Sequence, residues 1–186
     1  QETENAKKGL PSGITVKVNS LVDPKIIELL YEASKAGVRV QLIVRGICCL
    51  IPGIEGVSEN ITVMSIVGQL LEHSRIFRFE NAGNPRIYMG SADWMPRNLD
   101  RRVELVFPIE DETQKARAFG ILDTMLSDTT NARFMQSDTS YEHVDLRGKK
   151  KISSQLTFYH EAQARLKELQ SIEKDSVLIP IHSAEE

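Results

Sequence analysis

The sequence predicts an α/β fold in which helices flank a mixed β-sheet. The first evidence is an alternating, β-rich segment at residues 14–19, followed by Asp23-Pro24, a pair typical of the start of a helix. That helix is expected to end at Gly37, and a largely apolar strand at residues 38–44 comes next. A strand, a helix and a second strand in this order predict two parallel strands joined by a right-handed crossover. A length of 186 residues and a hydrophobic fraction of 41% suit a single globular domain.

Further elements are expected along the rest of the chain. They are a strand at 61–66, a short helical piece at 67–72, a hairpin of strands 76–79 and 86–89, an irregular loop at 94–98, a strand at 102–109, a helix at 111–126, a polar stretch at 128–150 and an amphipathic helix at 152–169. Residues 1–10 are interpreted as a polar leader, 11–170 as the domain, and 171–186 as an acidic tail that is expected to be disordered. Because the chain opens with a polar stretch and no initiator methionine, we expect it to be part of a longer protein.

Composition excludes several classes of protein. The net charge of −3 shows that the protein is not generally basic, so we expect no nucleic-acid partner. No apolar run approaches the roughly 18 residues of a membrane span, and the start of the chain has no signal-peptide pattern. The adjacent cysteines, Cys48 and Cys49, form neither a disulfide framework nor a zinc site. These features predict a cytoplasmic protein without a transmembrane segment.

Arginine is unevenly distributed along the chain. Between Ala36 and Gly148 there are eleven arginines and a single lysine, Lys115. A solvated surface would mix the two cations, whereas a site that holds phosphate oxygens favours guanidinium, which is always charged and offers a planar fork of donors. Arg45 directly follows the strand at 38–44, and ligands of open α/β sheets collect beyond the carboxyl ends of strands. Arg45 is therefore a candidate phosphate ligand.

The segment from Leu71 to Glu104 contains the other candidate residues. His73 comes just before the expected hairpin, Arg75 follows it at two residues, and Ser91 lies beyond the hairpin. Imidazole is the side chain whose charge changes near neutral pH. Glu104 lies in the next expected strand and is predicted to accept the imidazole N–H of His73. That contact would fix the tautomer of the ring and favour the imidazolium form.

Five motifs stand out in the arginine-rich part of the chain: LIVRGIC at 42–48, SENI at 58–61, SIVG at 65–68, LEHSR at 71–75 and SADWMPRN at 91–98. They resemble the C-terminal domain of bacterial polyphosphate kinase, the long-chain enzyme of the phospholipase D-like superfamily. The resemblance extends from about residue 9 to residue 164. It implies a phospholipase D-like fold and an enzyme that reversibly transfers the terminal phosphate of ATP to polyphosphate. In that family the reaction passes through a phosphohistidine and requires Mg²⁺.

The resemblance also implies roles for individual residues. Arg45 matches the arginine that binds the ATP phosphates, and His73 matches a second active-site histidine at the nucleotide. Arg102 and Glu104 match a charged pair that lines the active tunnel. The candidates are His73, Arg102 and Glu104 as catalytic residues, Arg45, His73 and Arg75 as ligands of the ATP phosphates, and Ser91, Asp93 and Asn98 as supporting residues. Arg45 and Arg102 would supply fixed positive charge to the transferring phosphoryl group.

Part of the family's machinery has no counterpart in this sequence. The missing parts are the histidine that becomes phosphorylated, the arginines linked to magnesium and the tyrosine that meets the base. We therefore expect the isolated chain to be inactive, the Mg²⁺ ligands to lie mainly outside it, and upstream domains of the same enzyme to be its partners. ATP or ADP and inorganic polyphosphate are the expected ligands. The full-length enzyme is expected to be a homo-oligomer, and its association with membranes is left open.

Two positions depart from the superfamily pattern. In that pattern a lysine follows the histidine at two residues and an asparagine follows Gly-Ser, whereas this sequence has Arg75 and Asp93 at those places. The departures argue against phosphodiesterase chemistry. Two alternatives stay open at the level of sequence: a phospholipase D-like phosphodiesterase or nuclease half-site, and a non-catalytic domain that binds polyanions through its arginines.

Overall fold

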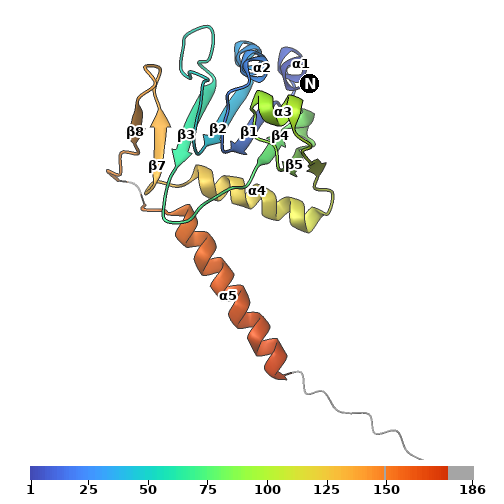
Figure 1. Ribbon diagram of the computed structural model, residues 1–186, viewed down its shortest axis with the longest axis vertical. Coiled ribbons are helices and arrows are strands. Elements are labelled where there is room, and N and C mark those ends of the chain that lie inside the picture. The colour runs from blue at the N-terminus through green and yellow to red at the C-terminus, as the bar shows by residue number, and fades with distance from the viewer. Residues whose placement is uncertain (149, 176–186) are drawn as a thin grey trace, which may run out of the picture.

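A computed structural model describes residues 1–148 and 150–175 of the chain. Within them eight strands form one mixed sheet in the order β6-β5-β4-β1-β2-β3-β7-β8 (Figure 1). The strands are β1 Gly13–Val18, β2 Arg39–Val44, β3 Ile61–Ile66, β4 Ile76–Phe79, β5 Arg86–Gly90, β6 Val106–Pro108, β7 Ala132–Met135 and β8 Tyr141–His143. The helices are α1 Glu2–Lys7, α2 Pro24–Lys35, α3 Pro96–Arg101, α4 Glu112–Leu126 and α5 Ser154–Asp175, with a 3₁₀ turn η1 at Asn81–Gly83. The predicted α/β fold is confirmed.

The predicted β-α-β unit forms the centre of the sheet. β1 and β2 pair in parallel, and the register places Val18 opposite Val44. Asp23 caps α2 as expected, because its side chain accepts a hydrogen bond from the Ile26 backbone N–H at 2.9 Å. Gly37 follows the end of the helix with a φ of +89°, a conformation that glycine adopts without strain. Since parallel strands end at the same edge of a sheet, the residues that follow β1 and β2 meet there.

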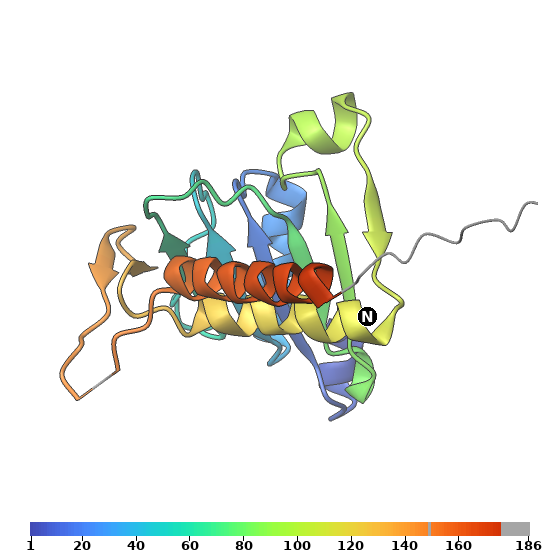
Figure 2. The same ribbon diagram turned by 90° about the horizontal axis from the view of Figure 1, so that it is seen from below.

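Helices cover both faces of the sheet (Figures 1 and 2). On one face Leu30 of α2 is buried in a cluster with Val16 of β1. On the other face Leu122 of α4 is buried in a second cluster with Ile43 of β2. α5 lies beside α4 and then extends beyond the body of the domain (Figures 1 and 2). Among the described residues, no helix combines the length and the apolar character needed to cross a membrane.

The first ten residues, interpreted above as a polar leader, contain a helix that packs on the domain. Glu2 of α1 is only 6% exposed. One of its carboxylate oxygens accepts the Gly13 backbone N–H and the other accepts the Asn81 N–H, each at 2.9 Å. α1 is thereby joined to the start of β1 and to the turn between β4 and β5. At the other end of the chain, α5 continues to Asp175, and the remainder of the expected tail, 176–186, lies outside the described residues.

Four segments differ from the sequence-based expectations. Residues 67–72 are not helical, residues 96–101 form α3 inside the expected loop, β6 is shorter than expected, and the polar stretch after α4 contains the β7–β8 hairpin. The first difference has a visible cause. Leu70 donates its N–H to the side chain of Gln155 at 3.0 Å and accepts from it at 2.8 Å, which holds the segment in a non-helical course. Because Gln155 is far from Leu70 in sequence, no local sequence pattern could predict this contact.

Asp128 joins the end of α4 to β7 and α5. It is 2% exposed, and one carboxylate oxygen accepts the backbone N–H groups of Thr130, Asn131 and Ala132. The other oxygen accepts the N–H and the hydroxyl of Ser154 at 2.7 and 2.8 Å. A single carboxylate therefore sets where α5 begins, and with it the position of Gln155 against Leu70.

Replacing Asp128 with alanine should lower the free energy of unfolding by about 3 kcal/mol, because several buried donors lose their acceptor together. Urea denaturation of the chain measures this loss. Asp138→Ala is the matched control, because Asp138 accepts hydrogen bonds from Ser140 in an exposed turn and should matter little. Equal losses in the two variants would contradict the central role of Asp128.

Candidate active site

The candidate residues collect at the edge of the sheet where β1 and β2 end. Asn19 follows β1 and Arg45 follows β2. β4 starts beside the end of β1, and β5 ends beside the start of β4. His73, just before β4, and Asp93, just after β5, are therefore brought to the same edge. The topology assembles side chains from four separate parts of the chain.

A buried ion pair between Arg75 and Asp93 lies at the centre of this edge. Arg75 Nη2 is 2.8 Å from Asp93 Oδ2, and Nε donates to Oδ1 at 3.3 Å. The two side chains are only 10% and 8% exposed. Asp93 Oδ1 also accepts the backbone N–H groups of Asn19 at 2.7 Å and Ser20 at 3.2 Å. Burial alone would raise the pKa of Asp93, but the hydrogen bonds from Arg75, Asn19 and Ser20 outweigh it and hold the pKa below its usual range.

The same guanidinium group orients His73. Arg75 Nη1 donates to the carbonyl oxygen of His73 at 2.7 Å and lies 2.8 Å from its Nδ1, whereas Nη2 is 3.4 Å from Nε2. Because guanidinium only donates, the imidazole of His73 is the acceptor in its close contact with Arg75. All three nitrogens of Arg75 have partners, and the residue is 9% exposed. Its role as a phosphate ligand stays a prediction, and this geometry favours a positioning role.

Glu104 does not contact His73 as expected. Its carboxylate accepts hydrogen bonds from the Ser91 hydroxyl and the Asn98 side-chain amide, and within the described residues it forms none with His73. The cause is the close approach of the chain after β5 to the chain before β6. A Cβ on Gly90 would lie 2.6 Å from the carbonyl oxygen of Leu105, so only glycine allows that approach. The hydrogen bonds from Ser91 and Asn98 lower the pKa of Glu104.

Arg45 is the candidate with free donors. Its Nε donates to the Asn19 side-chain oxygen at 2.9 Å, and the residue is partly exposed. Neither terminal nitrogen has a hydrogen bond or ion pair with any described residue, so the fork is free to bind two oxygens of an anion. Arg102 is exposed, and it too has no such partner in the described part of the chain. Both arginines can serve as ligands without breaking an existing contact.

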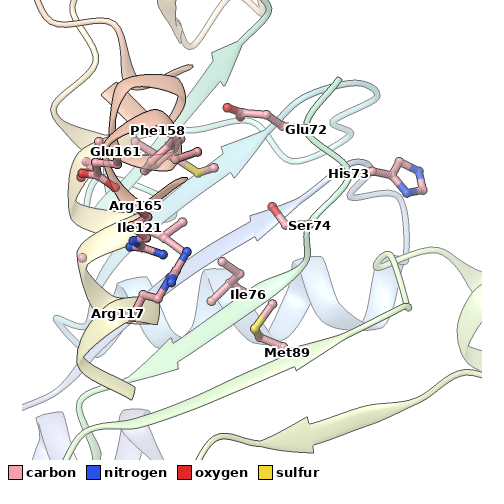
Figure 3. Close-up of a pocket in the computed structure, with 14 residues that line it drawn as sticks. Glu72, His73, Ser74, Ile76, Met89, Arg117, Ile121, Phe158, Glu161 and Arg165 are labelled. Atoms are coloured by element: carbon pink, nitrogen blue, oxygen red, sulfur yellow. The ribbon is translucent and has the colours of Figure 1, made fainter. Parts of the chain in front are cut away.

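A cavity of about 530 Å³ opens beside His73, between α4, α5 and the β4–β5 hairpin. Ile76, Met89 and Phe158 supply much of its apolar lining, and Arg117 and Arg165 stand on the helix side (Figure 3). The imidazole of His73 points away from this cavity (Figure 3). The cavity is therefore not the space that the imidazole ring faces.

Asn19, Ser20 and Lys17 belong to the site but were not expected from the sequence. Asn19 and Ser20 follow the carboxyl end of β1, which is the same topological signal that made Arg45 a candidate. Lys17 is a lysine inside a strand of apolar residues, and such a strand at the centre of a sheet must bury it.

No group of three or more metal-binding side chains occurs among the described residues.

The fold is that of a phospholipase D-like domain. A crystal structure of a phospholipase D family member, Nuc from Salmonella typhimurium, matches with a TM-score of 0.51 and 17% identity over 73% of this chain and 89% of that chain, which shows the fold alone. The crystal structure of polyphosphate kinase from Porphyromonas gingivalis matches with a TM-score of 0.84 and 38% identity. That match covers 88% of this chain and 25% of the other.

Sequence comparison then identifies the family. The family model described as polyphosphate kinase C-terminal domain 2 matches residues 1–155. The polyphosphate kinase of Lactiplantibacillus plantarum is 54% identical over 162 residues, which are 87% of this chain and 23% of the relative. The polyphosphate kinase of Escherichia coli K12 is 46% identical over 159 residues, 86% of this chain and 23% of the relative. The chain belongs to the polyphosphate kinase C-terminal domain family, and it spans about a quarter of the length of these relatives.

Asp93→Asn should destabilise the chain, because it leaves the Arg75 guanidinium buried without a counter-ion. We expect the free energy of unfolding at pH 7 to fall by about 3 kcal/mol, as measured by urea denaturation. The loss should also depend on pH. Since folding lowers the pKa of Asp93 below 3.8, its contribution is complete above this value and is lost as the pH falls through the folded-state pKa.

The stabilities of the unmodified chain and the Asp93→Asn variant should therefore converge on acidification. Asp100→Asn, which changes an exposed carboxylate of the same type, is the control and should differ little from the unmodified chain at either pH. A loss in Asp93→Asn that is the same at acidic and neutral pH would show that the ion pair is not its source.

Proposed function

We propose that this chain is the C-terminal catalytic part of a longer polyphosphate kinase, which reversibly transfers the terminal phosphate of ATP to polyphosphate. Family membership supports the class of enzyme. The observation that supports the role of this chain is the free guanidinium fork of Arg45 at the carboxyl edge of the sheet, connected through Asn19, Asp93 and Arg75 to an oriented His73. A fixed cation and a fixed hydrogen-bond donor are what a transferring phosphoryl group requires.

Two transfer steps make up the proposed reaction. First, the bond between the γ-phosphorus and the oxygen it shares with the β-phosphate breaks, a phosphorus–nitrogen bond forms to a histidine outside this chain, and ADP is released. Then a terminal oxygen of polyphosphate takes the phosphoryl group from that nitrogen and frees the histidine. A departing ADP phosphate has a second pKa of roughly 6, so it needs little help from a proton donor. We propose that the imidazole of His73 only donates a hydrogen bond to the developing charge.

Magnesium is implied by the family resemblance, but the carboxylates of this site do not fit it. Asp93 is committed to Arg75, and Glu104 is committed to Ser91 and Asn98. We propose that the ligands of the ion lie outside this chain and on the substrate phosphates. The chain's own contribution would then be the positive charge of Arg45 and Arg102.

Further proposals concern partners and location. Upstream domains of the same polypeptide would complete the site, and the full-length enzyme would be a homo-oligomer in the cytoplasm. ATP, ADP and polyphosphate would be its ligands, and a net charge of −3 gives no support to nucleic acid as a partner. The phosphodiesterase alternative is less well supported, because Arg75 and Asp93 neutralise each other at the places where that chemistry uses lysine and asparagine.

Arg45→Lys tests the phosphate ligand in the full-length enzyme. A lysine keeps the charge but loses the fork, so we expect kcat/KM for polyphosphate synthesis from ATP to fall by about 100-fold with folding unchanged. Arg39→Lys is the matched control, because Arg39 is exposed at the opposite end of the same strand, and it should have near-normal activity. Unchanged kinetics in Arg45→Lys would remove Arg45 from the site.

Labelling with γ-labelled ATP and magnesium tests the division of the site between this chain and an upstream domain. The full-length enzyme should acquire label that is stable in base and lost in acid, and peptide mapping should place it outside residues 1–186. The isolated chain should acquire none. His73→Ala in the full-length enzyme should label more slowly at the same position. Label on His73 itself would overturn the assignment, because this histidine would then be the nucleophile.

A further inference from the structure

Lys17 lies inside the sheet, although lysine is a residue that is almost never buried without a partner. It is 1% exposed and is the next-to-last residue of β1, opposite Ile43 of β2 and Ile76 of β4. Alternate positions of β1 belong to the apolar cluster under α2, so Lys17 is directed to the other face of the sheet. The chain that approaches β4 passes over that face (Figure 2).

The ammonium group of Lys17 contacts the backbone carbonyl oxygens of the two residues on either side of His73. Its Nζ is 3.4 Å from the carbonyl oxygen of Glu72 and 3.4 Å from that of Ser74. The segment at 67–75 has no helix or strand of its own, so long-range contacts must hold it. Gln155 holds Leu70 at its beginning, and Lys17 is placed to hold the part that includes the histidine.

We infer that Lys17 is a positioning residue for His73: its buried ammonium group holds the carbonyls of Glu72 and Ser74 and keeps the imidazole at the carboxyl edge of the sheet. The inference rests on the proposed function only for what His73 does there. The contacts themselves concern the structure of the segment at 67–75, and they can be tested without any assumption about the reaction.

Keeping this charge inside the protein is unfavourable for folding. Burial lowers the pKa of Lys17 from 10.5 to about 8; Glu72 and Asp93 oppose this shift, and Arg45 and Arg75 add to it. Because the folded-state pKa lies below the ordinary one, the cost is complete below about pH 8 and disappears as the pH rises toward 10.5. A residue present only to fill the sheet would be better replaced by an apolar side chain of similar length.

Lys17→Met in the full-length enzyme separates positioning from packing. At pH 7 its melting temperature should equal or exceed that of the unmodified enzyme. The difference should shrink at about pH 9.5, because the folded enzyme then holds Lys17 largely uncharged and its burial destabilises the fold less. Limited proteolysis should cut within 67–75 several times faster, because the carbonyls have lost their donor. The kcat for polyphosphate synthesis should fall at least about tenfold, while KM for ATP stays within a factor of about two.

Lys25→Met is the matched control, since it removes a lysine from the exposed surface of α2 and should change none of these measurements. Unchanged proteolysis within 67–75, or full activity in Lys17→Met, would overturn the inference. A large fall in melting temperature or a failure to fold would also overturn it, because either would make Lys17 an ordinary structural residue. If the unmodified enzyme makes no polyphosphate, the proposed function fails, and proteolysis and melting still decide the role of Lys17.

Discussion

The candidate site depends on the buried ion pair between Arg75 and Asp93. Each charge without the other would cost several kcal/mol, so the pair forms as a unit or not at all. Asp93 reaches the backbone after β1 through Asn19 and Ser20, and Arg75 reaches both the ring and the carbonyl of His73. One interaction thus connects the end of β1, the start of β4 and the end of β5, and sets the direction of the imidazole.

The ion pair also decides which positive charges this edge can offer to a ligand. In the superfamily pattern the positions of Arg75 and Asp93 hold a lysine and an asparagine, whereas here they hold opposite charges that neutralise each other. The positive charge available to a ligand is therefore that of Arg45, whose terminal nitrogens have no partner among the described residues. A site with its inner charges paired and its outer cation free suits an anion that approaches from another domain, as the proposed two-part enzyme requires.

Buried charge of this kind needs a stable surrounding fold. Two apolar clusters, one on each face of the sheet, supply that stability and leave the carboxyl edge for polar groups. Lys17, Arg75 and Asp93 are all buried close to that edge. Moving Arg75 away from Asp93 would separate opposite charges in a medium of low dielectric constant, which opposes rearrangement of this edge. In the proposed enzyme, such an edge would hold His73 and Arg45 in place before the substrate arrives and would reduce the reorganisation needed during transfer.

Short-range patterns in the sequence were sufficient for the β-α-β unit, the hairpin and the place of Arg45, because a helix cap, an alternating strand and a strand end depend on neighbouring residues. The family resemblance was also readable from the sequence, and comparison confirms it. Only the tertiary structure decided the partners of polar groups. Glu104 bonds to Ser91 and Asn98 instead of His73, and the segment at 67–72 is not helical because Gln155 binds it. The reason is physical: a buried charge or amide takes whichever complementary group the fold brings within about 3 Å, and that group's distance along the chain has no bearing on it.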